Sequence, residues 1–138
     1  MQQLKDVMSH DVKILNPEAT IKDAARQMRD GDFGFMPVGE NDRLVGTLSD
    51  RDIVIRAVAD GMDANTKVRN LMSTEVMWAY ENDSVEKASR IMSDKQIRRL
   101  PIVNAEKRLV GVVALGDLAV DGGDVNAAGK TLSNISKH

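Results

Sequence analysis

The feature of the sequence that most limits its possible folds is an internal repeat. Shifting the 138-residue chain by 64 positions aligns many identical residues, among them Met8-Ser9 with Met72-Ser73, Arg26 with Arg90, and Pro37 with Pro101. With one inserted residue the shift becomes 65, and Arg43-Leu-Val-Gly46 then matches Arg108-Leu-Val-Gly111 without a mismatch. A solenoid needs about three or more repeats to bury its faces, so two copies indicate two units that pack on each other.

Each copy carries the same order of local patterns. In the first copy an apolar run at residues 12–15 is followed by an amphipathic helical pattern at 20–28, two strand patterns at 35–38 and 43–48, and a final helix from about 50 to 59. Thr20 and Asp23 form a capping-box pattern, and Ile21, Ala24, Ala25 and Met28 recur at helical spacing. The sequence therefore predicts an α/β (α+β) chain of two β-α-β-β-α repeats.

These patterns also divide the chain. We expect a first repeat at residues 1–60, a linker with a short connecting helix at 61–70, a second repeat at 71–120, and a tail at 121–138 with the pattern of a short helix. The tail contains Ala128-Gly-Lys-Thr131, which is similar to the end of a phosphate-binding P-loop. That motif requires glycine at the position of Asp124, so docking of a short apolar helix is the better interpretation.

Composition excludes several classes of function. The 19 basic and 21 acidic residues give a net charge of -2, so no overall basic field favours nucleic acid or an anionic membrane. There is no Cys, and the two histidines, His10 and His138, lie near opposite ends, so we expect no metal site. Neither a signal peptide nor an apolar membrane span is present, which favours the cytoplasm.

The stretch from Gly46 to Ile53, with the sequence GTLSDRDI, carries the clearest candidate site. A strand that ends at a helix start leaves backbone N–H groups that favour a phosphate. Ser49 can donate to a phosphate oxygen, Arg51 adds a charge-assisted bond, and Asp52 can accept from ribose hydroxyls. The alternative is a plain helix N-terminus, in which Ser49 and Asp52 only cap the helix.

A second candidate is the pair Arg98 and Arg99, directly before Leu100-Pro101. Adjacent strand residues point to opposite faces, so at most one of the two faces a given pocket. The equivalent residues of the first copy are Gly34 and Phe35, so packing of the repeat does not require the arginines. A solvated pair is the alternative.

The chain resembles a tandem pair of CBS domains, the cystathionine-β-synthase type, also called a Bateman module. The resemblance spans about residues 4–120 and lies in ordered motifs of both copies: Arg43–Ile53, Ile97–Val103, Arg108–Leu118 and the Met-Ser openings at Met8 and Met72. Small bacterial proteins made of this pair alone are the most similar. The resemblance implies two repeats packed as a pseudo-two-fold pair, with adenosine-containing ligands bound in clefts between them.

Carried over residue by residue, the resemblance implies one complete site. It would combine Ser49, Arg51 and Asp52 with residues of the second copy: Tyr80, Asp83, Ser84, Val85, Arg98 and Arg99. The twin site would use Asp117, but Ala114 replaces the hydroxyl there, so it should be weak or empty. Trp78 and Tyr80 lie near the expected base end, where stacking and plain packing are both open.

The expected function is therefore a regulatory sensor module that binds AMP, ADP, ATP or S-adenosylmethionine as a regulatory ligand, with no further cofactor. We expect a homodimer, an unidentified effector protein, and no catalytic residues, since no nucleophile and base pair emerges from the sequence. The alternative is a ligand-free dimerisation or interaction scaffold.

Overall fold

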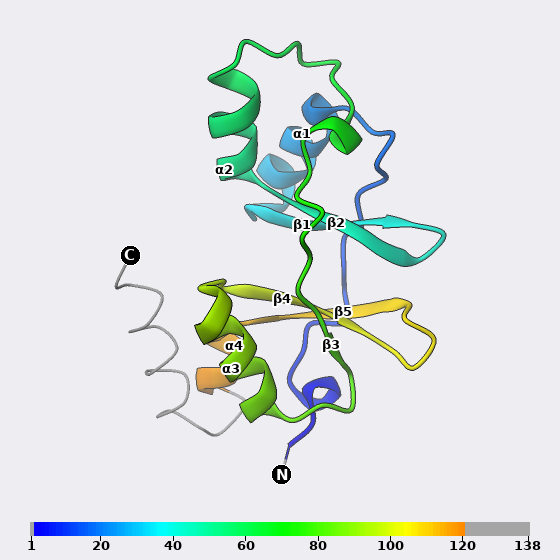
Figure 1. Ribbon diagram of the computed structural model, residues 1–138, viewed down its shortest axis with the longest axis vertical. Coiled ribbons are helices and arrows are strands. Elements are labelled where there is room, and N and C mark those ends of the chain that lie inside the picture. Colours follow the sequence, from blue (N-terminus) through cyan, green and yellow to red (C-terminus); the bar gives the residue numbers. More distant parts are fainter. Residues whose placement is uncertain (1, 121–138) are drawn as a thin grey trace. The chain divides into compact units, whose positions relative to one another are not determined.

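The computed structural model of the chain describes the backbone of residues 2–120 and the side chains of residues 2–118. The described residues form two compact units, one of residues 13–76 and one that joins residues 2–12 to residues 77–120. In Figure 1 the dark-blue start of the chain thus belongs with the green to orange residues after 77. The expected tail at 121–138 lies outside the described residues.

The unit of residues 13–76 is built on an antiparallel hairpin. Strands β1 (Phe35–Glu40) and β2 (Arg43–Ser49) pair from Phe35 opposite Ser49 to Glu40 opposite Arg43. Asn41 and Asp42, both with positive φ, form the two-residue turn, which suits the twist of a hairpin. Helix α1 (Ile21–Gly31) precedes the hairpin, and the short 3-10 helix η3 (Val68–Asn70) follows it.

The expected strand at residues 12–15 is reduced to a single bridge. Leu15 N–H donates to Pro37 at 3.0 Å, and Gly39 N–H donates to Leu15 at 3.0 Å, which makes a parallel bridge to Val38. The pairing ends there because Pro17 follows and has no N–H to donate. In the second repeat the same element is strand β3 (Ala79–Tyr80).

Helix α1 begins where the capping-box pattern predicts. Thr20 Oγ1 accepts from Asp23 N–H at 3.1 Å, and an Asp23 carboxylate oxygen accepts from Thr20 N–H at 3.4 Å. Ile21, Ala24 and Met28 are buried as expected, but the expectation that Ala25 joins them is wrong. Ala25 is exposed because it lies about 100° around the helix from Ala24, beyond the face that contacts the hairpin.

The final helix of the first repeat starts at Asp50, as predicted. After α2 (Asp50–Asp52) the chain continues as a π-helix, η2 (Ile53–Val58), in which Ala59 N–H donates to the Val54 carbonyl at 3.1 Å. Only Ala57 of this segment is buried in the core. A π-helix of this length is rare, and π-helical turns are frequent at functional sites.

The other unit is a three-stranded sheet with the order β3-β4-β5. Strand β4 (Arg99–Val103) pairs in parallel with β3 and antiparallel with β5 (Leu109–Ala114). Helix α3 (Val85–Lys95) is capped by Ser84, whose Oγ accepts from Lys87 N–H at 3.1 Å, and α4 (Leu115–Val120) follows β5. The 3-10 helix η1 (Leu4–Asp6) contributes the buried Leu4 to this unit's core.

Each Met-Ser opening packs against a glycine of the strand that follows the hairpin turn. In the unit of residues 13–76, Thr47 and Ser73 exchange two backbone hydrogen bonds, of 3.0 and 2.9 Å, beside Gly46. In the other unit, Ser9 and Val112 exchange bonds of 2.9 and 3.1 Å beside Gly111. The Met-Ser segment that opens each sequence repeat is therefore packed in the unit that holds the hairpin of the other repeat.

Membrane insertion by a helix has no support in this part of the chain. None of the helices within residues 2–120 is long and apolar enough to cross a bilayer.

Candidate functional site

The corner where β2 meets α2 holds three of the predicted site residues. Ser49 Oγ accepts from Asp52 N–H at 3.1 Å, and Asp52 Oδ2 accepts from Ser49 N–H at 2.9 Å. Both residues are half-buried, whereas Arg51 is exposed. The corner is therefore a complete capping box, as the alternative interpretation expects.

The capping box leaves one carboxylate oxygen of Asp52 without a hydrogen bond from the described residues. Asp52 commits Oδ2 to the Ser49 amide, and the described residues offer no hydrogen bond to its Oδ1. A carboxylate oxygen that is fixed by a helix start but not fully used can accept from an external hydroxyl pair. Capping and ligand binding are thus compatible at Asp52.

The geometry adds a residue that sequence reasoning did not assign to this corner. Asp50 N–H donates to the Gly34 carbonyl at 2.9 Å, and Asp50 Oδ1 accepts from Arg51 N–H at 2.8 Å. A Cβ at Gly34 would lie 2.6 Å from Asp50 Oδ2, so a larger residue there would displace this exposed carboxylate from its present position. The sequence held one indication that Asp50 belongs to this corner: Gly34 has no side chain, whereas the second repeat has Arg98 at the equivalent position.

The equivalent corner of the second repeat lies between β5 and α4. Asp117 Oδ2 accepts from Ala114 N–H at 2.9 Å, the same bond that Asp52 makes with Ser49. Ala114 has no hydroxyl, so the reciprocal half of the box is missing. The two corners differ by one polar group.

The segment from Tyr80 to Val85 forms a tight turn at the start of α3. Asp83 Oδ2 accepts from Tyr80 N–H at 2.8 Å and lies 3.3 Å from Lys87 Nζ. Tyr80 contacts Trp78 edge to face, with ring centroids 5.0 Å apart. The Val85 side chain is buried in the core of its unit, so a ligand would meet it only through backbone atoms.

Arg98 and Arg99 are both exposed at the start of β4. The Arg98 carbonyl accepts from Leu115 N–H at 3.2 Å and from the Arg99 guanidinium at 3.3 Å. Arg99 is paired with Ala114 across the β4–β5 ladder. Two cationic side chains therefore lie near the corner that holds Asp117, within one unit.

The structure brings some of the predicted site residues together and describes the others in a separate unit. Ser49, Arg51 and Asp52 belong to the unit of residues 13–76. The predicted residues between Tyr80 and Asp117 belong to the other. The two parts of the predicted site are thus described each by itself.

An ion-pair network fixes η3 within the unit of residues 13–76. The Glu18 carboxylate lies 2.7 Å from Lys67 Nζ and 2.8 Å from Arg69 Nε, and Arg69 also pairs with Glu40 at 2.8 Å. Hydrogen bonds from Lys67 and then Arg69 lower the pKa of Glu18, and those to Glu18 and Glu40 raise the pKa of Arg69. Because these groups are exposed, we interpret the network as a set of surface ion pairs that hold η3 in place and not as part of a binding site.

The described residues contain no cluster of potential metal ligands. Within residues 2–120 no three His, Cys, Asp or Glu side chains gather in a way that could hold an ion.

The sequence and the structure define the class of protein. The CBS domain family matches the sequence twice, over residues 4–58 and 68–120, so the chain belongs to that family as a pair of CBS domains. The resemblance seen in the motifs of the two repeats is confirmed, as is the α+β fold of two repeats.

Two relatives are similar over most of the chain. The chain is 46% identical over 136 residues to the CBS domain-containing protein YhcV of Bacillus subtilis, covering 99% of this chain and 96% of that protein. It is 36% identical over 121 residues to hypoxic response protein 1 of Mycobacterium tuberculosis, covering 86% and 84% of the two chains.

Solved structures show the same fold. Hypoxic Response Protein I with two coordinated zinc ions matches at a TM-score of 0.79 and 36% identity, over 86% of this chain and 98% of that one. A CBS domain protein from Pyrobaculum aerophilum complexed with AMP matches at 0.80 and 24% identity, over 96% and 98%. The CBS domain pair of protein MJ0100 in complex with 5'-methylthioadenosine and S-adenosyl-L-methionine matches at 0.77 and 24%, over 86% and 94%.

Proposed function

We propose that this chain is a regulatory module that binds an adenosine-containing ligand with residues of both repeats. The observation that carries the proposal is the corner of Ser49 and Asp52, where a carboxylate is fixed by a backbone N–H and keeps one oxygen for a ligand. CBS proteins of the same fold that are complexed with AMP or with S-adenosyl-L-methionine support this ligand class.

Each residue of the proposed site has a chemical role. Asp52 accepts from the two ribose hydroxyls, and Ser49 donates its hydroxyl hydrogen to a phosphate oxygen. Arg51 and whichever of Arg98 and Arg99 faces the pocket supply charge-assisted bonds to the phosphates. The remaining residues form the wall of the base and ribose pocket: Tyr80, Asp83, Ser84 and Val85.

The proposed site is not duplicated at full strength. Asp117 would hold a ribose in the second site, but Ala114 offers no hydroxyl where Ser49 offers one. We therefore assign one strong site and one weak site to each chain.

The test uses calorimetric titration with AMP, ADP, ATP and S-adenosylmethionine. Asp52→Ala should abolish saturable binding of whichever compound binds the wild-type chain. Asp117→Ala is the matched control, because it removes the same hydrogen bond of 2.9 Å to a backbone N–H but should leave the strong site intact. Equal loss of affinity in both variants would mean that Asp52 acts only through the fold.

A homodimer is the second part of the proposal. Val54 and Ile55 of η2 are 57% and 55% exposed, although both are large and apolar. Neighbouring apolar side chains left in water favour burial against another chain. Val54→Glu with Ile55→Glu should convert a dimer into a monomer in light scattering, and an unchanged mass would assign the contact elsewhere.

The alternative function is a scaffold without a ligand. The complete capping box favours it, because capping alone explains why Ser49 and Asp52 occupy the corner. It predicts that none of the four compounds changes the melting temperature, whereas a bound ligand raises it by mass action. In both cases we propose a cytoplasmic protein that acts on an effector protein and catalyses no reaction.

A further inference from the structure

Every backbone N–H group at the corner where β2 meets α2 is already hydrogen-bonded. Ser49 N–H donates to Asp52 Oδ2 at 2.9 Å, and Asp52 N–H donates to Ser49 Oγ at 3.1 Å. Asp50 N–H donates to the Gly34 carbonyl at 2.9 Å, and Arg51 N–H donates to Asp50 Oδ1 at 2.8 Å. The groups with which a helix start usually holds an anion are therefore occupied, so a phosphate at this corner depends on side chains alone.

The Asp50 side chain adds a fixed carboxylate to this helix start. The hydrogen bond from Arg51 N–H holds Oδ1, and Oδ2 occupies the space beside Gly34, where a Cβ would lie 2.6 Å from it. The carboxylate is exposed, so it faces whatever approaches the corner from the solvent. With Asp52, two carboxylates thus flank the single guanidinium of Arg51.

The fold of the repeat does not require this carboxylate. Leu115 takes the place of Asp50 in the second repeat, and its N–H donates to the Arg98 carbonyl at 3.2 Å. This is the same backbone bond that Asp50 N–H makes with the Gly34 carbonyl, and it forms there without an acidic side chain. The first repeat therefore has a carboxylate beside a glycine where the second repeat has a cationic residue.

We propose that Asp50 is a specificity-determining residue, which makes the site select a nucleoside monophosphate over the diphosphate and the triphosphate. This inference rests on the proposed function, because it concerns the same site. The Ser49 hydroxyl and the Arg51 guanidinium hold one phosphate. Each further phosphate brings negative charge within reach of the Asp50 carboxylate, which repels it, and the backbone at this corner offers no N–H group to offset the repulsion.

The experiment is a calorimetric titration of the full chain with AMP, ADP and ATP, in EDTA so that Mg²⁺ does not screen the phosphates. The wild-type chain should bind AMP about tenfold more tightly than ATP, with ADP in between. Asp50→Asn keeps an oxygen that can accept from Arg51 N–H and removes only the charge. It should lower the ratio of the ATP to the AMP dissociation constant by about tenfold, the effect of one charge a few ångströms away in a partly aqueous site.

A matched variant controls for the change in net charge. Asp42→Asn makes the same substitution in the turn at the far end of the β1–β2 hairpin, about 20 Å from Asp50 along the strand. Asn tolerates the positive φ of this position. The variant should leave the ratio of the two dissociation constants unchanged, and circular dichroism checks that both variants fold.

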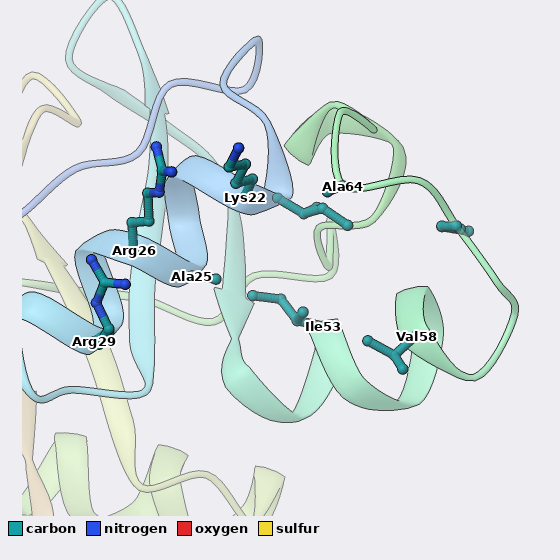
Figure 2. A pocket seen from close by; sticks show the side chains of 9 residues that line it. Lys22, Ala25, Arg26, Arg29, Ile53, Val58 and Ala64 are labelled. Atoms are coloured by element: carbon teal, nitrogen blue, oxygen red, sulfur yellow. The ribbon is translucent and has the colours of Figure 1, made fainter.

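A cationic groove in the same unit is the other place where ATP can gather. Figure 2 shows Lys22, Arg26 and Arg29 of α1 along this groove, with Ile53 and Val58 on its other side. Its apolar side adjoins the face of η2 that the proposed homodimer buries, so we assign no ligand to it. Arg26→Gln should leave the ratio of the two dissociation constants unchanged. A changed ratio would mean that the preference does not arise at the corner, which would overturn the inference.

The remaining outcomes separate this inference from the proposed function. If AMP, ADP, ATP and S-adenosylmethionine all fail to bind, both are wrong. If S-adenosylmethionine alone binds, if the wild-type chain binds ATP as tightly as AMP, or if Asp50→Asn leaves the ratio unchanged, only the inference is wrong. If added Mg²⁺ makes ATP the tighter ligand and Asp50→Asn abolishes this gain, Asp50 holds a cation for the polyphosphate, and the inference is also wrong.

Discussion

Replacing Gly46 with alanine tests how the Met72-Ser73 segment is held at the edge of β2. A Cβ at Gly46 would lie 2.7 Å from Met72 Sδ and 2.9 Å from the Ser73 carbonyl oxygen. The methionine can change rotamer, but the carbonyl is fixed by its bond of 3.0 Å from Thr47 N–H. The added methyl group must therefore push the segment outward and strain the bridge.

The expected cost follows from three terms. Overpacking in a tight site costs about 1–3 kcal/mol. Weakening one of the two bridge bonds adds about 1 kcal/mol, and replacing glycine returns about 0.4–1 kcal/mol from the unfolded chain. We expect a net loss of about 1–3.6 kcal/mol in the free energy of unfolding.

The assay is thermal and urea unfolding, followed by circular dichroism. At about 2.1 cal/mol/K per residue over 138 residues, this loss lowers Tm by about 3–12 °C. Gly116→Ala is the matched control: no atom lies within 4 Å of its added Cβ, and alanine favours helix α4, so stability should rise by about 0.5–1 kcal/mol.

A second variant isolates the cause of the loss. Gly46→Ala combined with Met72→Ala removes the sulfur contact but leaves the Ser73 carbonyl in place. The double variant should therefore remain less stable than Met72→Ala alone. If Gly46→Ala is as stable as the wild-type chain, the segment is not held as tightly as these distances require.

Three further predictions concern other parts of the chain. Glu18→Gln removes a carboxylate whose pKa is lowered by Lys67, so the wild-type chain should be more stable than the variant above about pH 4.5, with the difference fading as the pH falls further; a difference that grows in acid would contradict this. Thr20→Ala removes the N-cap of α1 and should lower the free energy of unfolding in urea by about 0.5–2 kcal/mol. An unchanged urea midpoint would mean that the cap does not stabilise the chain. Binding of AMP beside Tyr80 should change the emission of Trp78, the only tryptophan, and the change should be lost in Asp52→Ala; calorimetric binding without any change in emission would place the ligand away from Tyr80.

Local patterns in the sequence predicted much of each repeat. Helix α1 and the corner of Ser49 and Asp52 both begin with a capping box, which depends only on residues three positions apart. The hairpin strands and their turn followed from apolar runs separated by polar residues. The candidate site could be named from the same short motifs, because its Ser and Asp lie on one turn.

Features that depend on distant contacts could not be predicted in this way. The pairing of Ser73 with Thr47, and of Ser9 with Val112, joins segments that are 26 and 103 positions apart, so no local pattern encodes it. Ala25 has the same apolar character as Ala24, and only the position of the hairpin decides which of them is buried. The π-helical bonds of η2 also have no sequence signature, since β-branched residues there suit several backbones.

The division of the chain into units also fixes an order of completion during synthesis. The unit of residues 13–76 is continuous, so every residue it needs has been synthesised once the chain has grown past Val76. The other unit needs residues 2–12, which are made before residue 13, and β5, which ends at Ala114. Met8 and Ser9 therefore remain unpaired until their strand partner β5 has been synthesised, and the unit of residues 13–76 can fold before that point.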